Sequence, residues 1–354
     1  EPKVDTMITC PICGKPDCIQ TAEEVLDSIF QLYLACPECL PEPGWDKKAP
    51  LPALPGDQKI NSNTLLCLSC GRRPLDAIMG QVLSIMQEHG DRDDSTGLAQ
   101  VGTPLITPGF PIMYPPRLGP DNLVIIADNV QQVSAEDIVK KVPEVRGVIL
   151  RTGDQAQSVG ILDLDSEPHE YILLAGCDMR SDLAQTVFGE LVIYKNQSKL
   201  HIEFNNQDKM GIIEQLDMKG LLAGKVMVDG MCGSGMLGMM AMLSGAKNVI
   251  LNDAWRPAIE NLLINFKVNA EILDVDLETI VTLNDLPIIG NKPVQVARAT
   301  RNGKTVAEVY FGDLRLLGDL IDMCDVCLVD TYPSADPSDF VTIWSKKTPN
   351  VIVV

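Results

Sequence analysis

The pattern of apolar and polar residues changes near residue 220. Beyond it, short apolar runs alternate with stretches of helical periodicity, which is typical of a parallel sheet covered by helices on both faces. The pattern predicts an α/β domain over residues 216–354, with strands at 225–228, 249–251, 307–311, 326–329 and 351–354 and a helix at 257–267.

The preceding residues follow other patterns. Residues 121–215 are predicted to form a small α+β domain, with strands at 122–127, 145–150 and 171–175, a helix at 134–141, and a strand pair at 189–194 and 200–204. Residues 76–120 are interpreted as a helix followed by a Pro-rich linker. Residues 1–75 form a cysteine-rich module with a helix at 21–34.

Length and charge narrow the classes of function. The chain has 354 residues, of which 45% are hydrophobic, and this is enough for two or three domains. Its formal net charge of −19 disfavours binding to a phosphate backbone, although a local basic patch remains compatible with RNA. No apolar run is long enough to predict a membrane-spanning helix, and residues 1–9 lack the layout of a signal peptide.

The cysteines predict metal binding. Seven of the eleven cysteines lie in the first 70 residues, and six form the Cys-x-x-Cys pairs Cys10/Cys13, Cys36/Cys39 and Cys67/Cys70, with Cys18 as an extra candidate. Two such pairs make a tetrahedral zinc site, and six or seven cysteines could hold two ions with one ligand from elsewhere. The pairing stays open, and so do an iron–sulfur cluster and free thiols. Paired cysteines of this kind favour a reducing, cytoplasmic location.

A Gly-rich turn follows the first strand of the α/β domain. Asp229 ends this strand, and the turn contains Gly230, Cys232, Gly233 and Gly235 before an apolar helix. Glycines let the backbone approach a ligand closely, and a helix N-terminus offers free N–H groups. The turn therefore predicts a ligand site at the carboxyl edge of the sheet, although a turn needed only for packing has the same sequence.

The next two strands add polar groups at the same edge. Asn252, Asp253 and Ala254 end the second strand, where the carboxylate can accept hydrogen bonds from two ribose hydroxyls. Gly312 and Asp313 end the third, where Asp313 either binds an adenine amino group or caps a helix. The spacing G-x-x-G-x-G after an aspartate suits the cationic end of S-adenosylmethionine better than the pyrophosphate of a nicotinamide dinucleotide.

The fourth strand ends in a candidate catalytic segment. Asp330, Tyr332 and Pro333 follow it directly, at the edge where a methyl acceptor would face the cofactor. A carboxylate at this point can orient a nucleophile or take its proton, and the tyrosine ring can stack on a planar substrate. An ordinary strand-to-loop exit rich in turn-forming residues is the alternative interpretation.

These motifs carry a resemblance to a known family. Residues 228–269 resemble the first two motifs of class I S-adenosylmethionine-dependent methyltransferases, and the ending AIENLLINFKVN is most similar to the archaeal and eukaryotic tRNA guanosine N1-methyltransferases. The segments VPEVRGVILRTG, EYILLAG and VFGELVIYKN follow the order of that family's small domain. The resemblance covers residues 120–354. It implies a Rossmann-like catalytic domain in which Asp229, Gly230, Gly233, Asp253 and Asp313 contact S-adenosylmethionine.

Three departures from the family leave the acceptor open. The segment Asp330-Thr331-Tyr332-Pro333 replaces an Asn-Pro-Pro or Asn-Leu-Pro sequence, the cysteine module is not a usual part of the family, and no final antiparallel strand pair follows the fifth strand. The resemblance points to tRNA guanosine, whereas the negative charge favours a protein side chain or a small molecule. A non-catalytic binding module with the same fold is a further alternative.

Overall fold

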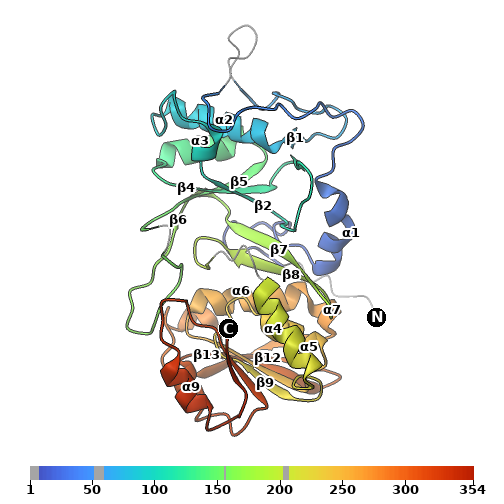
Figure 1. The fold of residues 1–354 in the computed structure, drawn as a ribbon, viewed down its shortest axis with the longest axis vertical. Coiled ribbons are helices and arrows are strands. Elements are labelled where there is room, and N and C mark those ends of the chain that lie inside the picture. Colours follow the sequence, from blue (N-terminus) through green and yellow to red (C-terminus); the bar gives the residue numbers. More distant parts are fainter. Residues whose placement is uncertain (1–7, 52–59, 155–156, 202–206) are drawn as a thin grey trace.

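The computed structural model describes residues 8–51, 60–154, 157–201 and 207–354. A four-stranded sheet lies at one end of the long axis and a seven-stranded sheet at the other, with the β-hairpin of strands β7 and β8 between them (Figure 1). Helix α1 (Ala22–Leu32) lies beside this hairpin. None of the helices in the described ranges is both long enough and apolar enough to cross a membrane.

The seven-stranded sheet contains the predicted Rossmann-like core. Its strand order is β11-β12-β13-β10-β9-β14-β15, and the five strands from β13 to β15 are mutually parallel. This is the doubly wound order 3-2-1-4-5, which confirms the predicted α/β fold class. The parallel strands are β9 (Val226–Asp229), β10 (Asn248–Asp253), β13 (Lys304–Phe311), β14 (Val326–Val329) and β15 (Val351–Val353).

Helices cover both faces of this sheet. Successive strand residues point to opposite faces, so neighbouring residues of one strand pack against different helices. Met227 packs with α5 (Met236–Leu243) and α6 (Arg256–Val268), while Val228 packs with α8 (Leu314–Leu317) and α9 (Ser338–Trp344). Helices α4 (Gln207–Met218) and α7 (Ala270–Leu273) join the α5 face. The helix α5, MLGMMAML, is apolar all round and almost fully buried.

An antiparallel strand pair extends the sheet at an edge that the sequence did not indicate. Strand β12 (Val294–Arg301) pairs with β13, and β11 (Asp276–Thr279) pairs with β12. The short 3-10 helix η3 (Leu283–Asp285) lies between them in the chain. The side chains of β11 are mostly exposed, so this strand carries little of the apolar signal by which strands are recognised.

The four-stranded sheet has the order β2-β4-β5-β6. Helices α2 and α3 cover one of its faces in a shared apolar core. The Pro-rich stretch predicted as a linker supplies strand β2 at the sheet edge and β3, which pairs with β1; proline is tolerated in edge strands. The elements are β1 (Arg73–Pro74), α2 (Leu75–Glu88), the 3-10 helix η2 (Leu98–Gln100), β2 (Thr103–Ile106), β3 (Arg117–Leu118), β4 (Leu123–Ala127), α3 (Gln132–Lys141), β5 (Val145–Leu150) and β6 (Ile172–Gly176).

The hairpin between the two sheets consists of β7 (Met179–Thr186) and β8 (Gly189–Asn196). The sequence predicts β8 but pairs it with residues 200–204, of which 202–204 lie outside the described residues. The true partner, β7, has the sequence MRSDLAQT, in which charged and polar side chains interrupt the apolar pattern.

Three buried asparagines attach this hairpin to the half of the molecule that contains the seven-stranded sheet. Asn261, Asn265 and Asn269 lie one helical turn apart on and just after α6, and their side-chain oxygens accept hydrogen bonds from the backbone amides of alternate β8 residues, at 2.7–2.9 Å. The amides of Asn265 and Asn269 also donate to carbonyls of β8. Four helical residues rise about 6.0 Å and two strand residues about 6.7 Å, so the side chains match the strand's repeat.

The central asparagine should be the most important for stability. Asn265→Ala removes three hydrogen bonds, including one to the Ser234 carbonyl in the Gly-rich turn, and leaves the buried amide of Tyr194 unpaired. We expect the free energy of unfolding to fall by about 2–3 kcal/mol, measured by urea denaturation. Gln215→Ala, on the exposed surface of α4, is the matched control. A loss no larger than that of the control would contradict this role for Asn265.

Candidate active site and cysteine centres

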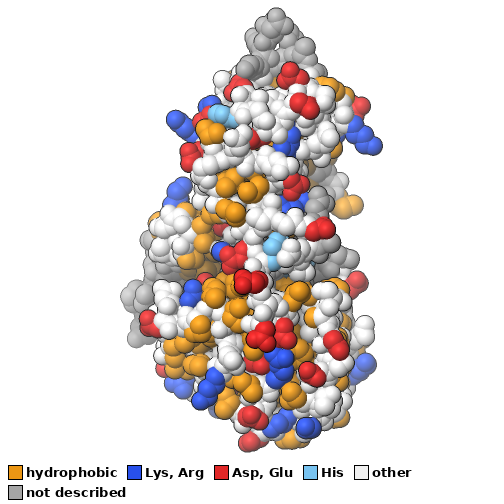
Figure 2. All heavy atoms as spheres, turned by 90° about the vertical axis from the view of Figure 1, so that its left-hand side faces the viewer, with side chains coloured by type: hydrophobic (Ala, Val, Ile, Leu, Met, Phe, Trp, Pro, Cys, Tyr) orange, Lys and Arg blue, Asp and Glu red, His pale blue; other side chains and the backbone are white. Residues whose placement is uncertain are grey.

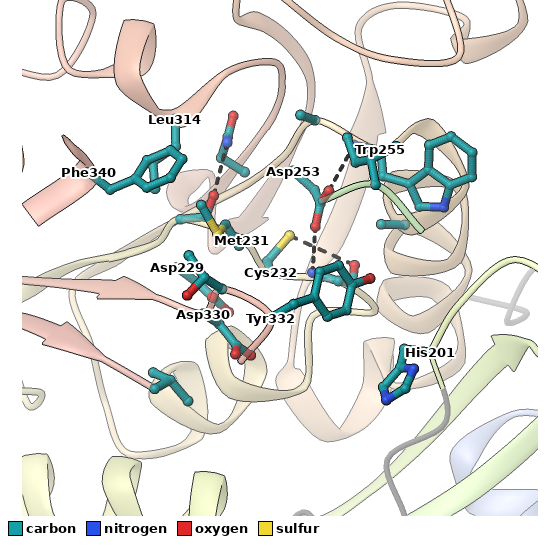
Figure 3. A pocket seen from close by; sticks show the side chains of 18 of the residues that line it. His201, Asp229, Met231, Cys232, Asp253, Trp255, Leu314, Asp330, Tyr332 and Phe340 are labelled. Carbon is teal, nitrogen blue, oxygen red and sulfur yellow. Dashed lines mark hydrogen bonds between the residues drawn. The ribbon is translucent and has the colours of Figure 1, made fainter. Parts of the chain in front are cut away.

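A pocket of about 370 Å³ lies at the carboxyl ends of the parallel strands. Its walls come from the ends of β9, β10, β13 and β14, from the Gly-rich turn, and from the segment 161–164 between β5 and β6. Pockets at this edge of a doubly wound sheet, and of this volume, are where such folds bind small molecules. Figure 3 shows Asp229 and Asp330 close together on one side and Asp253 across the pocket from them.

Asp229 is almost completely buried at the end of β9. Its Oδ2 accepts a hydrogen bond from the backbone amide of Gly238 at 2.9 Å, while Oδ1 has no hydrogen-bond partner among the described residues. Burial, reinforced by the charge of Asp330, raises the pKa of Asp229 to about 7. A buried carboxylate oxygen without a partner is costly, and a cationic ligand in the pocket would satisfy it.

The glycines of the Gly-rich turn let its backbone lie close to neighbouring groups. Gly235 has a φ of +88°, and a Cβ there would lie 2.1 Å from the Leu262 side chain, so only glycine fits. Gly233 has a φ of +51°, and its amide donates to Oδ2 of Asp253 at 2.9 Å. Cys232 is buried in the turn, and burial raises the pKa of its thiol well above the ordinary value, which argues against a nucleophilic thiolate.

Asp253 links the turn to the end of β10. Its two oxygens accept hydrogen bonds from the backbone amides of Gly233 and Trp255, and burial raises its pKa to about 6. Both oxygens keep further acceptor capacity toward the pocket. The neighbouring Asn252 is buried, and its amide donates to the carbonyls of Gly230 and Gly312, which holds the three strand ends in register. Ala254 follows in the pocket wall.

Asp313 has the capping role that the sequence left as an alternative. It is the N-cap of α8, and its side chain accepts from the backbone amide of Arg315 at 2.9 Å. The Arg315 guanidinium also pairs with Asp313 and, at 2.7 Å, with Asp163 of the small domain. Gly312 and Asp313 both line the pocket, so capping does not remove Asp313 from the site.

The predicted catalytic segment faces the turn from the end of β14. Lys209 of α4 donates to both carboxylate oxygens of Asp330, at 2.9 and 2.7 Å. The Tyr332 hydroxyl donates to the Val159 carbonyl at 2.6 Å, and its ring meets that of His201 edge to face. Pro333 continues the pocket wall. In Figure 3, the Tyr332 ring lies below Asp253, and His201 lies farther toward the lower right of the view.

Sequence reasoning missed four residues that form or support the pocket. Lys209 and Arg315 pair with pocket carboxylates, and Val159 and Asp163 attach the segment between β5 and β6 to the pocket's rim. Lone lysines and arginines carry no spacing signal, so only the folded chain identifies these pairs. Figure 2 shows acidic and hydrophobic side chains side by side over the middle and lower part of one face.

The structure collects eight cysteines into two groups. Cys36, Cys39, Cys67 and Cys70 form one group, and Cys10, Cys13, Cys18 and Cys177 form the other; within each group the Sγ atoms lie within 4.8 Å of one another. Each group could hold a metal ion. The six predicted cysteines are thus divided between the groups, and Cys177, far from the cysteine-rich module, was missed.

No protein-family model matches this sequence, and no curated protein does. Solved structures match at low identity. They include the tRNA m1G37 methyltransferase of M. jannaschii (15% identity, 73% of this chain and 58% of that chain, TM-score 0.32). They also include the tRNA (uracil-54, C5)-methyltransferase of Pyrococcus abyssi in complex with S-adenosyl-L-homocysteine (10%, 77% and 54%, 0.38).

A third match is Trm1 of Pyrococcus horikoshii in complex with S-adenosyl-L-methionine (20% identity, 46% of this chain and 38% of that chain, TM-score 0.31). The present chain therefore spans between 38% and 58% of the length of these three proteins. Two of these three matches, those from M. jannaschii and Pyrococcus abyssi, are named as tRNA methyltransferases.

Proposed function

We propose that this chain is an S-adenosylmethionine-dependent methyltransferase. The observation that carries the proposal is the buried Asp229, a residue of the pocket wall beside the Gly-rich turn, whose Oδ1 lacks a hydrogen-bond partner among the described residues. When bound, S-adenosylmethionine supplies an electrophilic methyl group on a sulfonium sulfur. Asp229 would neutralise the cationic end of this cofactor, and Asp253 would accept hydrogen bonds from the ribose hydroxyls.

The electrostatics of the pocket disfavour a nicotinamide dinucleotide. Asp229, Asp253 and Asp330 lie around the turn, and burial raises the pKa values of the first two because their charges are poorly solvated. A pyrophosphate would add two negative charges beside these carboxylates, whereas a sulfonium and an ammonium group would be attracted to them.

For the acceptor we propose a base of RNA. Asp330, held by Lys209, would accept a hydrogen bond from the attacking N–H group and take up its proton, while the Tyr332 ring offers a planar base a stacking surface. Catalysis would consist mainly of holding the acceptor in line with the methyl group. The pairing of Lys209 and Arg315 with carboxylates favours a neutral group inside the pocket, and a nucleobase is neutral.

One observation supports a second candidate acceptor. The acidic residues that line the pocket, Asp163, Asp229, Asp253, Asp313 and Asp330, outnumber its lysines and arginines, Lys195, Lys209 and Arg315. Such a lining would also suit the amine of a protein side chain or of a small molecule.

For the other cofactor, we propose zinc in the group Cys36, Cys39, Cys67 and Cys70, because four thiolates make a closed tetrahedral site.

Cofactor binding is the first test. Titration calorimetry should show micromolar binding of S-adenosylmethionine and no binding of NAD. Asp253→Ala should weaken the affinity by at least about 30-fold, because one hydrogen bond to a charged group contributes about 2 kcal/mol. The control, Asp276→Ala, removes an exposed carboxylate of β11. Absence of binding to correctly folded wild type would refute the proposed cofactor.

The raised pKa values predict a pH dependence. Asp229 and Asp253 ionise near pH 7 and near pH 6, and a cationic cofactor binds the ionised forms. The affinity should therefore be highest above pH 7 and fall as the pH is lowered, by up to about tenfold per unit for each carboxylate that must lose a proton. In Asp229→Asn the step near pH 7 should disappear. An affinity that stays constant between about pH 5 and about pH 8 would contradict this electrostatic role.

Methyl transfer tests the acceptor. Incubation with radiolabelled S-adenosylmethionine and unmodified tRNA should place label in a nuclease-sensitive fraction. Asp330→Asn should reduce this rate about 100-fold or more while the affinity for S-adenosylmethionine changes little, because the carboxylate acts on the acceptor. Asp322→Asn, an exposed carboxylate, is the control. Label found only in protein or small molecules would replace RNA with the second candidate.

A further inference from the structure

Two short segments of this chain fold into the same cysteine turn. In residues 10–15 and 67–72, the backbone amide of the first cysteine donates to the carbonyl five residues later, at 3.1 and 3.0 Å. The glycine four residues on donates back to the first cysteine's carbonyl, at 2.9 and 2.8 Å. These glycines, Gly14 and Gly71, have φ angles of +70° and +69°, which favour glycine. The two turns direct their cysteines toward one centre each.

The turns do not share a centre. The turn at 67–72 meets Cys36 and Cys39, whereas the turn at 10–15 meets Cys18 and Cys177. We infer that Cys10, Cys13, Cys18 and Cys177 form a second, separate zinc centre, which fastens the N-terminal segment to the hairpin β7–β8. The inference goes beyond methyl transfer and does not depend on it.

The sulfur positions have the dimensions of a zinc tetrathiolate. The Sγ atoms of Cys10 and Cys18 each lie 3.7 Å from Sγ of Cys177. A zinc–sulfur distance of about 2.3 Å gives a tetrahedron with edges of about 3.8 Å, whereas disulfide sulfurs lie about 2.05 Å apart. The other group has the same spacing, with 3.6 Å between Cys36 and Cys67 and between Cys39 and Cys70.

The charge beside the second centre also suits thiolates. The Arg146 guanidinium donates to Sγ of Cys18 at 2.6 Å. Among the described residues no carboxylate forms a salt bridge with Arg146, although its side chain is only partly exposed. An arginine is always positively charged, so an anionic partner is favoured here, and a zinc tetrathiolate carries a net charge of −2.

The second centre lies where separate parts of the chain meet. Cys177 is located between β6 and β7, and its amide donates to the Arg146 carbonyl of β5 at 2.7 Å. The Gln20 amide, two residues after Cys18, donates to the Tyr194 hydroxyl of β8 at 3.0 Å. Helix α1 packs on the same hairpin through Val25 and Ile29. The metal would thus join the N-terminal segment, the small sheet and the hairpin.

The zinc content of the wild-type chain tests the inference directly. We expect two zinc ions per chain by mass spectrometry, and X-ray absorption should show an average of four sulfurs at about 2.3 Å around each zinc. This result requires eight cysteines. A single zinc per chain, a shell of fewer sulfurs, or iron with acid-labile sulfide would overturn the inference.

Three single substitutions assign the ions to the groups. Cys177→Ser and Cys70→Ser should each retain one zinc per chain, because each disrupts a different centre. Cys324→Ser, a buried cysteine outside both groups, should retain two. Two zinc ions in Cys177→Ser would overturn the assignment of Cys177. If this variant does not fold, the wild-type stoichiometry and sulfur count still decide the outcome.

Hydrogen exchange distinguishes the fastening role from simple metal storage. In Cys177→Ser the amides of α1 should exchange several-fold faster than in the wild type, while in Cys70→Ser they should exchange at nearly the wild-type rate. Equal protection of α1 in all three proteins would show that the second centre does not hold this segment. S-adenosylmethionine affinity, measured in parallel, reports separately on the catalytic half, so failure of the proposed function would be distinguishable.

Discussion

The arrangement of the two halves depends on how the side chains of Asn261, Asn265 and Asn269 satisfy the outer edge of β8. A two-stranded hairpin exposes unpaired backbone groups, which are costly when buried. Through these asparagines, α6 pairs with the edge of β8 in the way that a third strand would. This is possible because their spacing along α6 nearly matches every second residue of β8. Asn265 also bonds the Ser234 carbonyl, so the same side chain fixes the Gly-rich turn. The position of the hairpin and the conformation of the Gly-rich turn therefore depend on the same side chain.

A second constraint is the concentration of carboxylates at one edge of the sheet. Asp229 is buried and Asp253 is half-buried at adjacent strand ends, where their pKa values rise because charge is poorly solvated. Such an arrangement costs stability in the empty pocket, and a cationic ligand would recover that cost. Lys209 and Arg315 offset part of the remaining charge at Asp330 and Asp313. The charge of this edge would therefore favour a cationic ligand over an anionic one.

Local signals made the α/β half predictable. The Gly-rich turn, the acidic strand ends and the short apolar strands each occupy a few consecutive residues, so the doubly wound sheet and its ligand edge could be inferred. Strand β7 was missed because Arg180 and Asp182, which pair with each other, interrupt its apolar pattern. Strand β11 was missed because it is mostly exposed. The three asparagines recur every four residues in the sequence. Their partner strand β8 lies about 70 residues earlier, however, and no local periodicity indicates a contact between such distant segments.

For the cysteines, metal binding is easier to predict from the sequence than the division of the ligands between two centres. The Cys-x-x-Cys spacing and the following glycines identify thiolate turns from a few neighbouring residues. Which turns share a centre depends on contacts between distant segments, and Cys177 has no second cysteine nearby to mark it. Its group forms only because β6 ends beside the N-terminal segment. The hairpin that follows Cys177 is then held on one side by this cysteine group and on the other by the asparagines of α6. The hairpin therefore connects the N-terminal segment to the half that contains the seven-stranded sheet, although it contributes little to the pocket itself.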